Sequence, residues 1–273
     1  MKIVKYIFVV FIIFILFLGV RFKYNLRDRH PDFNIDITIN KTGQLGQVYA
    51  GFAKMPITPK ITDTWNDLNG NARYEPKKGE SYNDINDNGM FDPIWIGGFH
   101  NSRPAQGVHD DLWARVMVID DGKTQIAIVS IDAVGLIYDD AVDIRKEVKK
   151  RIGCDYTIVS STHVHQAPDL IGIWGPSYFK SGVNKQYMKY VKKQTIAAIS
   201  TAVKNLIPVT LRIGQDLTGA IPYVIDSRDP QELDPGIRII QALDINTEET
   251  LGSLVSWSNH PETLWSKNLL ISS

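Results

Sequence analysis

The residues with the clearest chemical potential in this 273-residue chain are histidines that follow two apolar segments. His163 and His165 come directly after Tyr156–Ser161, and His260 stands in an Asn-His-Pro-Glu sequence after Leu254–Trp257. Residues two apart in an extended chain share a face, so both imidazoles of the His-x-His pair can enter one pocket. Zinc binds imidazole well, and a catalytic zinc takes three protein ligands and keeps an open position. We therefore expect the two segments to converge on one zinc site.

Other side chains could support such a site. Asp132, at the end of the apolar run Thr124–Asp132, is a candidate to orient a histidine through its ring N–H. His109 either joins the site or caps a turn, and Glu262 is expected to be a surface carboxylate. The chain has no Gly-x-Ser-x-Gly elbow, P-loop or dinucleotide fingerprint, which disfavours those chemistries.

A second pattern is an Asp- and Asn-rich repeat with a period of about 17 residues, inside an insert at 62–93. Oxygen-bearing side chains recur at relative positions 1, 3, 5 and 9, which is the spacing of an EF-hand calcium loop. These residues are Asp67, Asn69, Asn71 and Glu75 in the first copy, and Asp84, Asn86, Asn88 and Asp92 in the second. Neither copy has the Glu expected at position 12. We expect calcium in a structural role, and the alternative is a solvated loop of Asx turns without an ion.

Composition limits the remaining function classes. Hydrophobic residues make up 44% and charged residues 22% of the chain, which is enough for a packed core. Lys and Arg total 30 and Asp and Glu total 30, so no basic excess favours nucleic acid. Cys154 is the single cysteine, which excludes an internal disulfide and a cysteine-rich zinc module.

The N-terminal region predicts export. Tyr6–Val20 is an unbroken apolar run with lysines before it and Arg21 after it, as in a signal peptide or a membrane anchor. Gly19-Val20-Arg21 is a poor cleavage site, which favours an uncleaved anchor. We therefore expect an extracytoplasmic protein, either secreted or attached to the membrane through this helix.

The predicted fold class is α/β, a layered mixed β-sheet with flanking helices, preceded by an N-terminal hydrophobic helix. The expected organisation is a signal peptide or anchor at 1–23, a tether at 24–46 and a hydrolase domain portion at 47–273. Helices are expected at Tyr138–Ile152 and Asn184–Leu206, and strands at Val48–Ile57, Leu112–Asp120, Thr124–Asp132, Tyr156–Ser161, Val209–Ile213, Ile237–Ile245 and Leu251–Ser258. The continuous apolar run Thr124–Asp132 predicts a strand that is buried on both faces.

Three motifs in order resemble the neutral/alkaline ceramidase family. They are Ser160–Pro168 (SSTHVHQAP), Val129–Asp132 (VSID) and Trp257–Pro261 (WSNHP). The resemblance implies that His163 and His260 bind a catalytic zinc and that His165 lies beside the water or oxyanion. It also implies hydrolysis of the amide bond of an N-acylsphingosine, or of a related lipid or small-molecule amide, in sphingolipid metabolism.

The chain departs from this family at several points. Gln166 and Ala167 replace the Ser-Gly that follows the family's His-x-His, and the calcium-like insert is not typical of it. The remaining zinc ligands implied by the resemblance, a Glu and a Tyr, are expected beyond residue 273, so we expect an incomplete catalytic domain that is inactive on N-acyl lipids alone. The alternative is a non-catalytic, calcium-stabilised extracytoplasmic binding protein.

Overall fold

The computed structural model describes residues 2–34 and 46–273, which belong to two compact units, Met1–Ile39 and Asn40–Ser273. The first unit holds helix α1 (Lys2–Asn25). Its segment Lys5–Asn25 is long and apolar enough to cross a membrane, and none of it is buried within the protein. The predicted tether at 24–46 begins inside this helix, and its residues 35–45 lie outside the described residues.

The second unit is built on a mixed sheet of seven strands in the order β10-β9-β8-β1-β5-β6-β7. The pair β6 and β7 is parallel, and the other neighbours are antiparallel. This confirms the predicted α/β class with a mixed sheet. The strands are β1 (Tyr49–Pro56), β5 (Trp113–Asp120), β6 (Gln125–Ile131), β7 (Tyr156–Ser161), β8 (Ile207–Asp216), β9 (Ile237–Asp244) and β10 (Thr250–Trp257).

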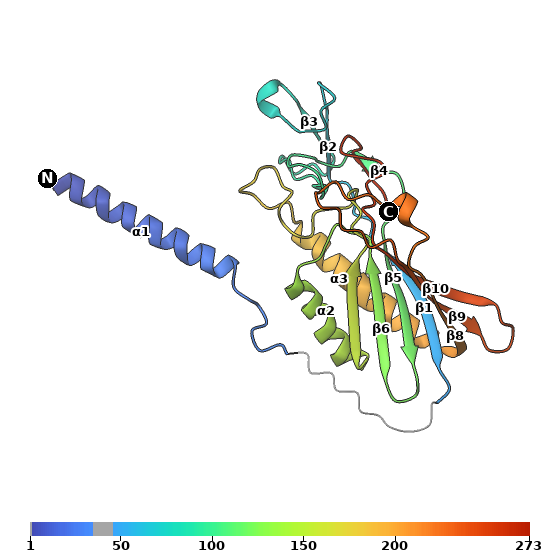
Figure 1. The fold of residues 1–273 in the computed structure, drawn as a ribbon. Helices are drawn as coiled ribbons and strands as arrows, with labels where there is room; N and C mark the ends of the chain where they lie inside the picture. Colours follow the sequence, from blue (N-terminus) through green and yellow to red (C-terminus); the bar gives the residue numbers. More distant parts are fainter. Residues whose placement is uncertain (1, 35–45) are drawn as a thin grey trace. The chain divides into compact units, whose positions relative to one another are not determined.

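Helices α2 (Tyr138–Arg151) and α3 (Lys185–Lys204) cover one face of this sheet (Figure 1). The buried stripe of α3 includes Val191, Ala198 and Ile199, which join the main core with residues of β5 and β6. The side chain of Asn184 starts α3 by accepting the N–H groups of Gln186 and Tyr187.

The expectation that the β6 strand is buried on both faces is only half met. Ala127, Val129 and Ile131 are fully buried against the helices, whereas the residues between them are only partly buried. The opposite face instead carries a smaller core around Met117. Here β10 packs closely on β1, because a Cβ at Gly252 would meet the Phe52 ring at 2.5 Å.

Short elements gather beyond the end of the sheet opposite the β5–β6 turn (Figure 1). Strands β2 (Asp63–Trp65) and β3 (Tyr82–Asp84) pair in antiparallel fashion, and β4 (Gly107–Val108) pairs in parallel with β11 (Leu270–Ile271). The remaining elements are the 3-10 turns η1 (Pro76–Lys78) and η2 (Ile221–Tyr223).

Candidate metal centre

Three histidine side chains that follow two different strands lie together. His163 and His165 come after β7, and His260 comes after β10. Ring centroids are 4.9 Å apart for His163 and His165, 4.5 Å for His163 and His260, and 5.3 Å for His165 and His260. One ring nitrogen of each lies within 4.8 Å of the others, and the described residues hold no second group of three His, Cys, Asp or Glu side chains this close.

The backbone at His163 and a carbonyl behind it fix the direction of this ring. The residue has a left-handed backbone (φ 64°), which costs on the order of 1–3 kcal/mol for a residue other than glycine. Its Nδ1 donates to the carbonyl oxygen of Val134 at 2.6 Å. This bond places the proton on Nδ1, so Nε2 keeps its lone pair for a metal ion.

Glu262 lies between the other two histidines. Its Oε1 accepts a hydrogen bond from Nδ1 of His260 at 3.1 Å and lies 3.0 Å from Nδ1 of His165. The contact between Glu262 and His165 is not a hydrogen bond, since neither ring nitrogen of this buried histidine has a hydrogen-bond partner. The structure therefore corrects the expectation that Glu262 is only a surface carboxylate. In the sequence, the His-x-Glu spacing after the strand could have indicated that Glu262 contacts a histidine.

The buried position of His165 keeps its ring neutral. Burial lowers the pKa of His165 to about 4; nearby Glu262 opposes this shift, and the two neighbouring histidines reinforce it. A neutral imidazole is the form that binds a metal ion or shares a proton with a substrate. His165 therefore has a lone pair available for a metal ion, and neither of its ring nitrogens has a hydrogen-bond partner within the protein.

Aromatic rings and a glycine turn enclose His165. The ring of Phe99 lies 5.0 Å from the His165 ring and 5.3 Å from the ring of Trp265. Gly98 is left-handed (φ +117°), and a Cβ there would meet Cγ of His165 at 2.7 Å. The glycine is required at this position because the backbone passes directly against the imidazole.

A buried arginine and Gln166 together join the two segments that carry the histidines. Nη2 of Arg103 donates to the carbonyl of His165 and to Oε1 of Gln166, and Nε2 of Gln166 donates to the carbonyl of Trp265. Burial lowers the pKa of Arg103 to about 10, and its Nε and Nη1 have no partner. Gln166, a departure from the ceramidase pattern, thus has a positioning role here. Nothing in the sequence near Arg103 indicated this contact.

Two further candidates lie elsewhere. The predicted role of Asp132 in orienting a histidine is corrected, because the Val134 carbonyl occupies Nδ1 of His163. Asp132 instead pairs with Arg115 at 2.6 Å and accepts the N–H of Trp113. His109 does not belong to the histidine group; it is exposed and contacts Asp110 at 2.8 Å.

The eight predicted calcium ligands lie in two loops with matching hydrogen bonds. Asp67 accepts the N–H groups of Asn71 and Ala72, as Asp84 accepts those of Asn88 and Gly89. The paired asparagine side chains of each loop, Asn69 with Asn71 and Asn86 with Asn88, donate to Glu75 and Asp92 respectively. In each loop the asparagine amides thus bind the carboxylate at the ninth position.

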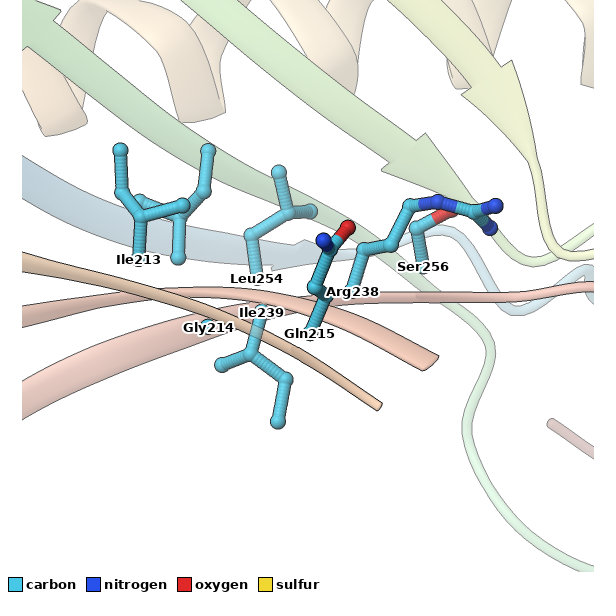
Figure 2. Close-up of a pocket in the computed structure, with 8 residues that line it drawn as sticks. Ile213, Gly214, Gln215, Arg238, Ile239, Leu254 and Ser256 are labelled. Carbon is cyan, nitrogen blue, oxygen red and sulfur yellow. The ribbon is translucent and has the colours of Figure 1, made fainter. Parts of the chain in front are cut away.

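A surface groove of about 540 Å³ lies away from the histidines. Strands β8, β9 and β10 line it with Ile213, Ile240, Leu254 and polar groups such as Arg238 (Figure 2). Figure 2 shows Ile213 and Leu254 projecting from the same side of the strands. None of the three histidines contributes to this groove, so it is not part of the candidate metal centre.

Comparisons with known proteins show a similarity of fold. No protein-family model and no curated protein sequence matches the chain. The neutral ceramidase from Pseudomonas aeruginosa has a similar structure, with 17% identity and a TM-score of 0.59 over 84% of this chain. A ceramidase complexed with C2 is similar over 83% of this chain, also with 17% identity and a TM-score of 0.59. The chain spans only 34% and 33% of the lengths of those proteins. The resemblance found in the sequence is thus confirmed at this level: the chain has a ceramidase-like fold.

Proposed function

We propose that this chain carries the metal centre of a zinc-dependent amide hydrolase of the ceramidase type. The observation that supports the proposal is the three-histidine group, in which buried His165 has two nitrogens without hydrogen-bond partners. Three imidazoles from two separate segments are a donor set that suits zinc. The ceramidase-like fold favours an N-acylsphingosine or a related lipid amide as the substrate.

In this proposal His163 and His260 hold the zinc ion, each with a ring fixed through Nδ1. The Val134 carbonyl and Glu262 supply those fixing contacts. A zinc ion in this position would polarise the amide carbonyl and lower the pKa of a water molecule towards about 7. The other residues around the metal centre would orient the substrate and shield the reacting atoms.

His165 has two roles open to it. As a neutral ring it can offer one N–H and one lone pair to the carbonyl oxygen of the amide or to the attacking water. It can also complete a set of three protein ligands, because it lies within the same 4.8 Å as the other two. Phe99 and Trp265 would provide an apolar wall beside it.

A lipid substrate is compatible with the N-terminal helix. Attachment through α1 would hold the second unit near the bilayer in which a lipid amide resides. We accordingly propose an extracytoplasmic protein that is anchored by this helix or secreted after its removal.

The proposal is tested first by metal binding to the full chain in detergent micelles. Zinc titration and the visible spectrum of bound Co²⁺ should report one tetrahedral site. His163→Ala and His260→Ala should each weaken zinc binding at least tenfold, because each removes one ligand of about three. His109→Ala is the matched control and should leave zinc affinity unchanged, since this exposed histidine lies outside the group.

Fatty-acid release from a short-chain N-acylsphingosine then tests the reaction. Any turnover should be lost in His163→Ala and retained in His109→Ala. Failure of the wild-type chain to bind zinc would refute the metal centre and favour a non-catalytic binding protein. Zinc binding together with hydrolysis of other amides, but not of N-acylsphingosines, would refute the substrate class alone.

A further inference from the structure

The two Asp/Asn loops are related by an approximate two-fold symmetry. A shift of 17 residues superposes Asp63 on Glu80 and Trp65 on Tyr82, as it does for the predicted calcium ligands. Strands β2 and β3 pair these repeats in antiparallel register, with Trp65 opposite its own counterpart Tyr82 and with Asp63 opposite Asp84. The bond from the N–H of Asn66 to the carbonyl of Ser81 extends the same register. One step further along it, Glu80 stands opposite Asp67.

This symmetry makes each repeat contribute a carboxylate to the loop of the other. Glu80, from the second repeat, accepts the N–H of Glu75 in the first loop at 2.6 Å. Asp63, from the first repeat, accepts the N–H of Asp92 in the second loop at 2.7 Å. Glu75 and Asp92 occupy the equivalent ninth position of the two loops, so the exchange is reciprocal.

These two exchanged carboxylates are buried without a cation. Asp63 is 0% exposed and Glu80 is 4% exposed, and Oε1 of Glu80 has no hydrogen-bond partner. In the described part of the chain neither carboxylate forms an ion pair with a Lys, Arg or His side chain. Burial of an uncompensated carboxylate is costly, so such groups are normally paired with a cation or coordinate a metal ion. A cation from solvent would supply the missing partner of Oε1 of Glu80, whereas the two oxygens of Asp63 already accept the N–H groups of Ile85 and Asp92.

We propose that the insert binds two calcium ions, and that each site is completed by the buried carboxylate of the other repeat. The first site takes its oxygens from Asp67, Asn69, Asn71, Glu75 and Glu80, and the second from Asp84, Asn86, Asn88, Asp92 and Asp63. Each set has three carboxylates and two amides, and the three carboxylates would have to close in around the ion, because they do not all lie within 4.8 Å of one another in the structure. Glu80 and Asp63 thereby replace the acidic ligand that position 12 of an EF-hand loop would provide.

The ion that suits these sets is calcium. Calcium accepts six to eight oxygen ligands in flexible geometry, whereas magnesium demands a nearly ideal octahedron and retains water. Residue 6 of each loop, Ala72 (φ 60°) and Gly89 (φ 74°), has the left-handed backbone of the sharp turn in such loops. Because the ligands come from both repeats, ion binding would lock the two loops to each other.

Calorimetric titration of the full chain in detergent micelles, with Ca²⁺ as the probe, tests this pairing. The wild type should bind two ions, and Mg²⁺ should bind at least tenfold more weakly. Asp67→Asn with Glu80→Gln should remove one site, because both changes affect the first loop. Asp84→Asn with Glu80→Gln should remove both sites, because the changes then affect different loops. Asp87→Asn is the matched control, and should leave two sites because this exposed acid is outside both sets.

The outcomes separate the proposal from its alternatives. If Glu80 served its own repeat, Asp84→Asn with Glu80→Gln would retain one site, and the exchange would be refuted. No calcium binding by the wild type would refute the sites themselves, whether or not the variants fold. Far-UV circular dichroism of each variant without calcium shows whether a variant has lost calcium sites because it is misfolded. None of these results depends on zinc or on hydrolysis.

Discussion

At the scale of single residues, the candidate centre is defined by what fixes each imidazole. His163 and His260 both use Nδ1 for a contact with the protein, to the Val134 carbonyl and to Glu262. This leaves the opposite nitrogen of each ring for a ligand. His165 differs, since it is buried and both its nitrogens lack partners. The three residues therefore have the same side chain but different environments, which is the basis for assigning them different roles.

Glu262 offers a direct test of this arrangement. Glu262→Gln should weaken zinc binding by about 10- to 100-fold, the usual effect of losing a partner that orients a ligand. The change keeps the side chain's size and removes the negative charge beside His165 and His260. Glu147→Gln is the control, because Glu147 forms an exposed ion pair with Arg151 on α2. Equal zinc affinity in both variants would show that Glu262 does not support the site.

At the scale of elements, tight backbone turns position the histidines. The Gly97-Gly98 turn runs against the His165 ring, and the segment after β7 bends sharply at His163. Such conformations are uncommon and are maintained only when the surrounding structure fixes them. Arg103 and Gln166 provide this restraint by linking the loop after β7 to the loop that carries Trp265.

Gly98→Ala should therefore impair the centre without touching a ligand directly. The added Cβ would lie 2.7 Å from Cγ of His165, and φ +117° is unfavourable for alanine. We expect a loss of about 1–3 kcal/mol in the free energy of unfolding and a weaker zinc site. Gly122→Ala is the control, because Gly122 is also left-handed (φ +79°) but has open space around it. It should lose stability while keeping its zinc affinity, and an equal loss of affinity in both variants would contradict the packing argument.

The sequence predicted the elements better than their contacts. The strand at Tyr156–Ser161 and the helix at Tyr138–Arg151 follow from apolar periodicity, which is a local property. Strand β8 is longer than the predicted Val209–Ile213, because its last three residues, Gly214 to Asp216, are exposed and lack the alternation of a half-buried strand. The contacts of Arg103 and Val134, and that of Glu262 with His165, depend on segments far apart in the sequence, and no local pattern encodes them. The exchange of Asp63 and Glu80 was missed because each acid lies four residues ahead of its own loop.

At the scale of the whole molecule, the chain combines a helix that is long and apolar enough to cross a membrane with a ceramidase-like unit that carries three candidate ion sites, one for zinc and two for calcium. The proposed zinc site relies on two loop segments that are linked by Gln166, which buried Arg103 holds in place. The proposed calcium sites belong to an insert with its own small core, which includes Trp65 and Ala72. Because these two groups of residues do not overlap, calcium is expected to affect stability, whereas zinc is expected to affect the reaction.

The last prediction concerns α1, whose apolar side chains from Tyr6 to Val20 are exposed in the structure. We expect the intact chain, with Met1 retained, in the membrane fraction after a carbonate wash. Phe14→Lys with Leu16→Lys should move it to the soluble fraction or block its export, because each central lysine costs roughly 2.5–3.5 kcal/mol on insertion. Tyr24→Lys with Asn25→Lys is the control, and should stay in the membrane because lysines at a helix end can reach the interface. A wild-type protein that is soluble and lacks the apolar segment by intact mass would show a cleaved signal peptide. A soluble protein that keeps the segment would contradict both membrane roles.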